Sequence, residues 1–139
     1  MSYGKRDYPL AEKHPQAMRG GRGKALDDIT LDAVLSDAVT MEDLRITPEA
    51  LRGQAAISRD AGRPTLALNF ERASELVNVP QDVIMRVYEL LRPGRAKSTA
   101  ELRDAAALMR DTYGAARIAA FIEEAATTYE ERGLFTKRF

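Results

Sequence analysis

The chain has 139 residues, enough for a single domain that buries about two-thirds of its unfolded surface. Its 21 basic residues balance 21 acidic residues, so the net charge is zero and gives no global reason to bind nucleic acid or an anionic membrane. Cysteine is absent, which excludes disulfides and thiolate chemistry, and no apolar run approaches the ~20 residues of a membrane span. We therefore expect a cytoplasmic protein.

Residues 1–27 are expected to form an irregular N-terminal arm. They hold four of the nine glycines and two of the six prolines, and they show no helical periodicity. Basic side chains outnumber acidic ones in this segment. Apolar side chains in the arm, such as Tyr8, Leu10 and Met18, could anchor it on its own domain or on a neighbour, and such arms often become ordered only against a partner surface.

Residues 28–139 are expected to form a helical domain. Thr30 can cap a short helix through Leu35. Thr47-Pro48-Glu49 places a cap, a proline and an acid where a helix begins, and we expect this helix to run to about Ala61. Its apolar stripe is thin, so docking on another chain is one way to hold it.

Four further helices are expected after Gly62. Pro64 can open one of them, with Leu66, Phe70, Ala73 and Val77 on one face. Pro80 begins the next, Ser98 to Glu101 form a capping box for a third, and the last lies between Gly114 and Gly133. No stretch alternates as a strand would, so the predicted fold class is all-α.

Candidate chemical groups favour a structural or binding role. His14, the only histidine, lies in the arm with no obvious orienting partner. Gly20 to Lys24 lack the required residues of a phosphate-binding loop and indicate a flexible turn. The glutamate pairs near the C-terminus lack the histidines of a carboxylate-bridged metal site. We therefore predict no catalytic, cofactor-binding or metal-binding residue in this chain.

Several short motifs occur in a particular order along the chain. The central motif is the stretch from Asp43 to Ala55. The others are Asp7-Tyr-Pro-Leu10, Lys13-His-Pro15, Leu26 to Leu31, Asp60-Ala-Gly-Arg63, Leu68 to Arg72 and Glu75-Leu76. Each is weak alone, but together they span nearly the whole chain and resemble one family, the small (gamma) subunits of adenosylcobalamin-dependent diol and glycerol dehydratases.

The resemblance implies membership of a three-chain carbon–oxygen lyase, assembled as a dimer of heterotrimers. Its large (alpha) subunit is a TIM-type barrel with the substrate and a cation, and cobalamin lies between the large and medium (beta) subunits. The complex converts propane-1,2-diol, or glycerol, to an aldehyde by radical dehydration. The small subunit is implied to be non-catalytic, with adenosylcobalamin held by the other subunits.

The implied fold is an open up-and-down bundle of about three main helices, in which the helices starting near Ser98 and Gly114 join into one. The predicted subunit-interface residues are Tyr8, Pro9 and Leu10 in the arm, followed by Ile46, Leu51, Arg52, Asn69, Phe70 and Arg72.

Two alternatives stay open at this point. The chain could be the small subunit of a glycerol dehydratase, or a free-standing helical adaptor that binds another protein. Some diol dehydratase small subunits carry a longer N-terminal extension associated with packaging into bacterial microcompartments, whereas six residues precede Asp7 here. Encapsulation is therefore left open, together with the preference for diol or glycerol.

Overall fold

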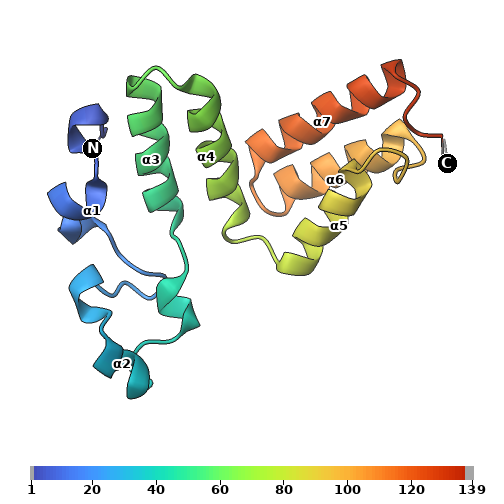
Figure 1. Ribbon diagram of the computed structural model, residues 1–139. Coiled ribbons are helices and arrows are strands. Elements are labelled where there is room, and N and C mark those ends of the chain that lie inside the picture. The colour runs from blue at the N-terminus through green and yellow to red at the C-terminus, as the bar shows by residue number, and fades with distance from the viewer. Residues whose placement is uncertain (1, 137–139) are drawn as a thin grey trace. The chain divides into compact units, whose positions relative to one another are not determined.

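The computed structural model describes residues 2–136 and confirms the all-α prediction (Figure 1). Within that range there is no β-strand, only an isolated bridge between Arg19 and Ala25. None of the described helices is long and apolar enough to cross a membrane. The α-helices are α1 (Leu10–Lys13), α2 (Leu31–Leu35), α3 (Pro48–Asp60), α4 (Pro64–Leu76), α5 (Gln81–Leu91), α6 (Thr99–Asp111) and α7 (Ala116–Glu131).

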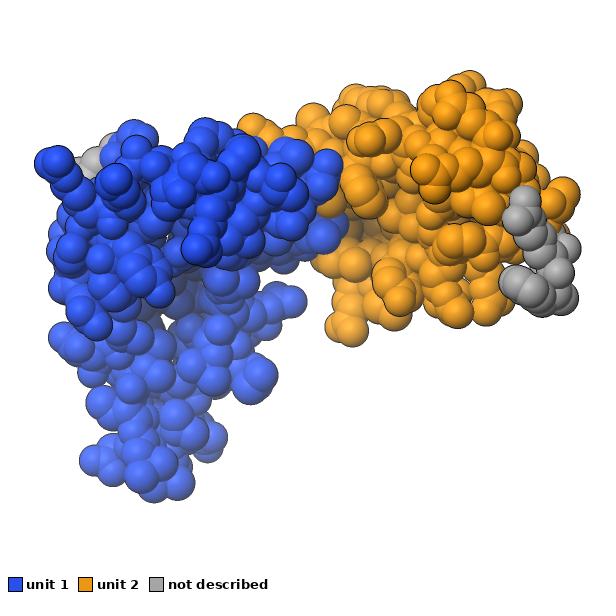
Figure 2. Space-filling model, turned by 45° about the horizontal axis from the view of Figure 1, so that its top comes forward, with its two compact units in different colours: residues 1–77 blue, residues 78–139 orange. Residues whose placement is uncertain are grey.

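Contacts along the chain define two compact units, residues 1–77 and residues 78–139 (Figure 2). Unit 1 contains the arm, α3 and α4, whereas unit 2 contains α5, α6 and α7. The division of the chain at residue 27 stays a prediction.

Three predicted helix caps are confirmed by hydrogen bonds. The hydroxyl oxygens of Thr30 and Thr47 accept from the backbone N–H groups of Ala33 and Ala50, each at 3.2 Å. Ser98 accepts from the Glu101 N–H at 3.4 Å, although the Glu101 carboxylate accepts from Lys97 rather than from Ser98. These side chains satisfy amide groups that a helix leaves unpaired at its start.

The α3–α4 hairpin of unit 1 packs through small side chains. Ala55 and Ala67 are almost completely buried, and Gly62 makes the turn with φ of 74°, a value that glycine adopts without strain. The predicted apolar face of α4 is wrong in detail, because Leu66 is exposed while Ala67 and Ser74 are buried. Small residues let the two helices approach closely and leave the bulkier side chains of α4 at the edge.

The N-terminal arm lies against α3 of its own chain. The Leu10 side chain is 1% exposed, and its Cδ1 lies 3.0 Å from the position that a Cβ atom would take on Gly53. The Asp60 carboxylate accepts a hydrogen bond from the Lys5 N–H at 2.8 Å. The arm therefore makes intramolecular contacts with its own domain, through Leu10 and the Lys5 N–H.

Unit 2 is centred on the antiparallel pair α6 and α7. Leu102, Met109 and Ile122 are completely buried between these helices, and Arg110 pairs with Glu123 at 2.6 Å. The expected joining of the two helices is wrong, because Gly114, with φ of 65°, reverses the chain between them. The described chain therefore has five helices of eleven residues or more, α3 to α7, instead of about three.

Removing the buried Leu102 side chain tests this core. We expect Leu102→Ala to lower the free energy of unfolding by about 2–5 kcal/mol, since the substitution leaves a cavity between α6 and α7. The matched control, Met85→Ala, alters a half-exposed side chain and should change stability by less than about 0.5 kcal/mol. Urea denaturation followed by circular dichroism measures both, and equal effects would contradict the assignment of Leu102 to the core.

Candidate protein-docking surface

A bidentate ion pair connects the glycine-rich turn to the segment before α3. Arg22 donates from Nε to Asp43 Oδ1 at 2.8 Å and from Nη2 to Asp43 Oδ2 at 2.5 Å. Its Nη2 also donates to the Ala38 carbonyl oxygen at 3.3 Å. The Asp43 side chain is 0% exposed, whereas half of the Arg22 side chain remains accessible. We call this arrangement the Arg22–Asp43 clasp.

The two glycines before Arg22 make the clasp sterically possible. A Cβ atom on Gly20 would lie 2.1 Å from the Asp43 carbonyl oxygen, and one on Gly21 would lie 2.3 Å from that of Glu42. The turn closes with a Gly23 N–H to Gly20 carbonyl hydrogen bond of 2.9 Å. The turn interpretation is confirmed, but these glycines serve close backbone approach rather than flexibility.

The electrostatic environment keeps Asp43 ionised. The hydrogen bonds from Arg22, opposed by burial and reinforced by the Thr40 N–H at 2.9 Å, lower the pKa of Asp43 to about 2. The same carboxylate caps the 3₁₀ turn Met41–Leu44. One aspartate therefore holds both its own turn and the glycine-rich loop.

Exposed apolar side chains concentrate in residues 26–46, which we call the 26–46 segment. Among the described residues, seven of the twelve exposed large apolar side chains belong to it. They are Leu26, Leu31, Val34, Leu35, Met41, Leu44 and Ile46. Leu31, Leu35 and Met41 are each more than 70% exposed. So dense a group of exposed apolar side chains is typical of an interaction surface.

The exposure follows from the shortness of the local elements. Helix α2 has five residues, and in Figure 1 it extends away from the α3–α4 pair of unit 1. Neither α2 nor the turn Met41–Leu44 is long enough to present a face to another helix, and Val39 is the one large apolar residue of the segment that is buried. The interface residues predicted from the sequence include only Ile46 from this segment. The sequence feature that could have identified the whole segment is a run of apolar residues without a helix long enough to bury them.

A hollow of about 340 Å³ continues this apolar surface towards α3. Its apolar lining comprises Leu26, Ile29, Leu44, Ile46 and Ala50, together with Met18, and Asp43 of the clasp also lines it. The hollow gives the segment a concave side with a mainly apolar lining, to which Arg19 and Arg45 add charged side chains.

The predicted interface residues fall into three groups by burial. Tyr8, Ile46, Arg52 and Asn69 are exposed. Leu10 and Leu51 are buried within unit 1, and the remaining three, Pro9, Phe70 and Arg72, are half-buried. No contact with another chain tests these assignments, so they stay predictions.

His14 has an orienting partner that the sequence did not reveal. Its Nε2 lies 2.7 Å from Asp7 Oδ1, and its ring packs at 5.2 Å from that of Tyr3. The Gly4 N–H and His14 together lower the pKa of Asp7. These contacts join one part of the arm to another, which supports a structural role. Among residues 2–136, no cluster of three or more histidine, aspartate or glutamate side chains could hold a metal ion.

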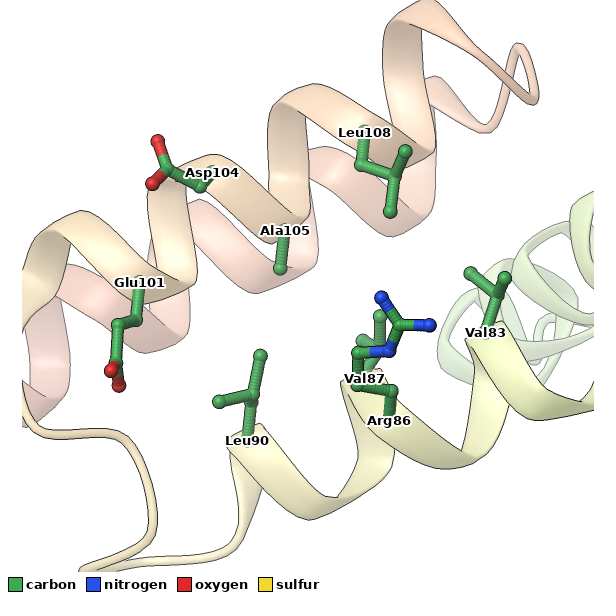
Figure 3. A pocket seen from close by; sticks show the side chains of 8 residues that line it. All are labelled: Val83, Arg86, Val87, Leu90, Glu101, Asp104, Ala105 and Leu108. Atoms are coloured by element: carbon green, nitrogen blue, oxygen red, sulfur yellow. The ribbon is translucent and has the colours of Figure 1, made fainter.

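Unit 2 has a separate groove of about 360 Å³ between α5 and α6. Figure 3 shows Leu90 of α5 and Ala105 and Leu108 of α6 facing this space, with Glu101 and Asp104 along the α6 side. Tyr129 of α7 donates its hydroxyl hydrogen bond to the Leu91 carbonyl and thereby fixes the end of α5. The groove has fewer strongly exposed apolar side chains than the 26–46 segment.

Because the clasp contains an ionised aspartate, we expect the stability of unit 1 to fall at acid pH. Because the folded-state pKa of Asp43 lies below its unfolded value of about 3.9, its stabilising contribution is complete above that value and disappears as the pH falls through about 2. We expect the stability difference between wild type and Asp43→Asn to shrink between pH 6 and pH 2. Urea denaturation at several pH values measures this difference, and a constant difference would contradict the role of Asp43.

Substitution of the glycines tests the close approach. Gly20→Ala should destabilise the chain by about 3 kcal/mol, because the new methyl group overlaps a backbone carbonyl. Gly23→Ala is the comparison, since Gly23 has φ of 83° but open space around it, and should cost about 1 kcal/mol. Thermal or urea unfolding measures both, and the reverse order would show that backbone conformation matters more than contact.

Comparisons with known proteins identify the family of this chain. The sequence model of a family described as dehydratase small subunit matches residues 3–136. A propanediol dehydratase small subunit from Citrobacter freundii is 52% identical over 126 residues, covering 91% of this chain and 73% of the relative. The protein of that name from Salmonella typhimurium strain LT2 is also 52% identical, with 91% and 72% covered. The chain therefore belongs to the dehydratase small-subunit family.

Proposed function

We propose that this chain is the small, non-catalytic subunit of a coenzyme-B12-dependent diol dehydratase that converts propane-1,2-diol to propanal. The carrying observation is 52% identity, over 91% of the chain, to two propanediol dehydratase small subunits. The exposed apolar 26–46 segment supports the proposal, because a subunit needs a surface that binds its companions.

In this proposal the companions are a large and a medium subunit, assembled with this chain as a dimer of heterotrimers in the cytoplasm or a microcompartment. Adenosylcobalamin supplies the radical chemistry and is held by the companions. Hollows of about 340, 360 and 570 Å³ among the described residues are of a size for ligands much smaller than this cofactor, which supports placing it on the companions. In this proposal, the chain contributes by positioning its companions.

Two other functions compete with this proposal. A glycerol dehydratase small subunit would have the same architecture and differ in the substrate of its complex. A free-standing adaptor would use the same exposed surface on an unrelated protein. The family match over residues 3–136 favours a dehydratase complex over the adaptor.

Co-expression with the large and medium subunits tests the proposal. With a tag on this chain, we expect to recover three chains whose aldehyde production from propane-1,2-diol requires added adenosylcobalamin. Parallel assays compare aldehyde production from propane-1,2-diol and from glycerol, and the preferred substrate distinguishes a diol dehydratase from a glycerol dehydratase. Recovery of this chain alone, with full activity in the other two subunits, would contradict the subunit role and favour the adaptor.

A further inference from the structure

We propose that the 26–46 segment is the principal docking element of this chain, and that its partner is a companion dehydratase subunit presenting an apolar groove with basic side chains at its rim. This inference rests on the proposed function and specifies the surface and the chemistry through which the complex forms. It places the main contact before α3, away from most of the interface residues predicted from the sequence motifs.

The apolar part of the argument is the exposure of α2. Leu31 and Leu35 lie one helical turn apart and are each 73% exposed. No other described part of the chain combines two exposed leucines in this way. Burial of such side chains in an interface favours binding because it removes their apolar surface from water.

The negative charge of the 26–46 segment indicates which side chains the partner's groove should have at its rim. Within its 21 residues there are six acidic residues and one basic residue, although the chain as a whole is neutral. Asp43 is used within the clasp, and Arg45 pairs with Glu42 at 3.4 Å. Asp27, Asp32 and Asp37 remain exposed to solvent. A complementary surface must therefore place lysine or arginine around its apolar centre.

The clasp prepares this segment for binding. Arg22 contacts both Ala38 and Asp43, so it holds the residues that follow α2 before a partner arrives. A segment that is ordered in advance loses less conformational entropy on association. The interface is consequently expected to form without a folding step in this chain.

Paired substitutions test the apolar centre in the full complex. Leu31→Asn with Leu35→Asn removes apolar surface without changing charge, and we expect binding to the companion subunits to weaken about tenfold or more. Met85→Asn with Tyr88→Asn is the matched control, because these α5 side chains are 50% and 57% exposed in the other unit. Binding is measured by co-purification and by titration of the purified chain, and circular dichroism verifies that each variant folds.

A second pair tests the rim. Asp27→Asn with Asp32→Asn should weaken binding several-fold and reduce its dependence on salt between 0.1 and 0.5 M, because fewer charges remain to be screened. Glu130→Asn with Glu131→Asn on the exposed surface of α7 is the control and should change neither quantity.

The outcomes separate this inference from the proposed function. If the wild-type chain recovers an active complex and the α2 variant binds equally well, docking occurs elsewhere and the inference is wrong. If Asp27→Asn with Asp32→Asn changes neither the affinity nor its salt dependence, the proposed basic side chains at the partner's rim are wrong. If the wild-type chain recovers neither companion, the proposed function fails and this inference fails with it.

Discussion

The Arg22–Asp43 clasp is the constraint on which the candidate surface depends. Without it, the stretch between the arm and α3 would have only short helices and turns, whose own hydrogen bonds are few. The clasp adds two charge-assisted hydrogen bonds to a carboxylate that is completely removed from solvent. Gly20 and Gly21 belong to the same constraint, because any side chain there would meet backbone carbonyl oxygens.

The two units differ in the side chains that form their cores. Unit 2 buries large side chains such as Leu102 and Ile122 between α6 and α7. Unit 1 instead packs alanines between α3 and α4 and adds the arm through Leu10 and Gly53. Since much of its apolar surface lies outside that core, unit 1 can offer side chains to a partner.

Much of the secondary structure was predictable because its signals are local. Thr30, Thr47 and Ser98 cap helices where expected, and the glycines at 62 and 114 end them. The joining of α6 and α7 implied by the family resemblance was wrong, because Gly114 permits a reversal that buries both apolar stripes against each other. Similarly, Leu66 was expected in the core but is exposed, since the smaller Ala67 allows α3 and α4 closer contact.

The sequence by itself determined the all-α class, most helix boundaries and the family, because propensity, capping and motif order act between residues that are close in the chain. Only the tertiary structure decided which apolar residues remain exposed. Leu10 and Leu51 became buried while Leu31 and Leu35 stayed exposed, and this depends on which elements pack together. The pairing of Arg22 with Asp43 and of His14 with Asp7 was equally invisible in sequence. Such contacts depend on the spatial approach of backbone segments, which the local pattern does not encode.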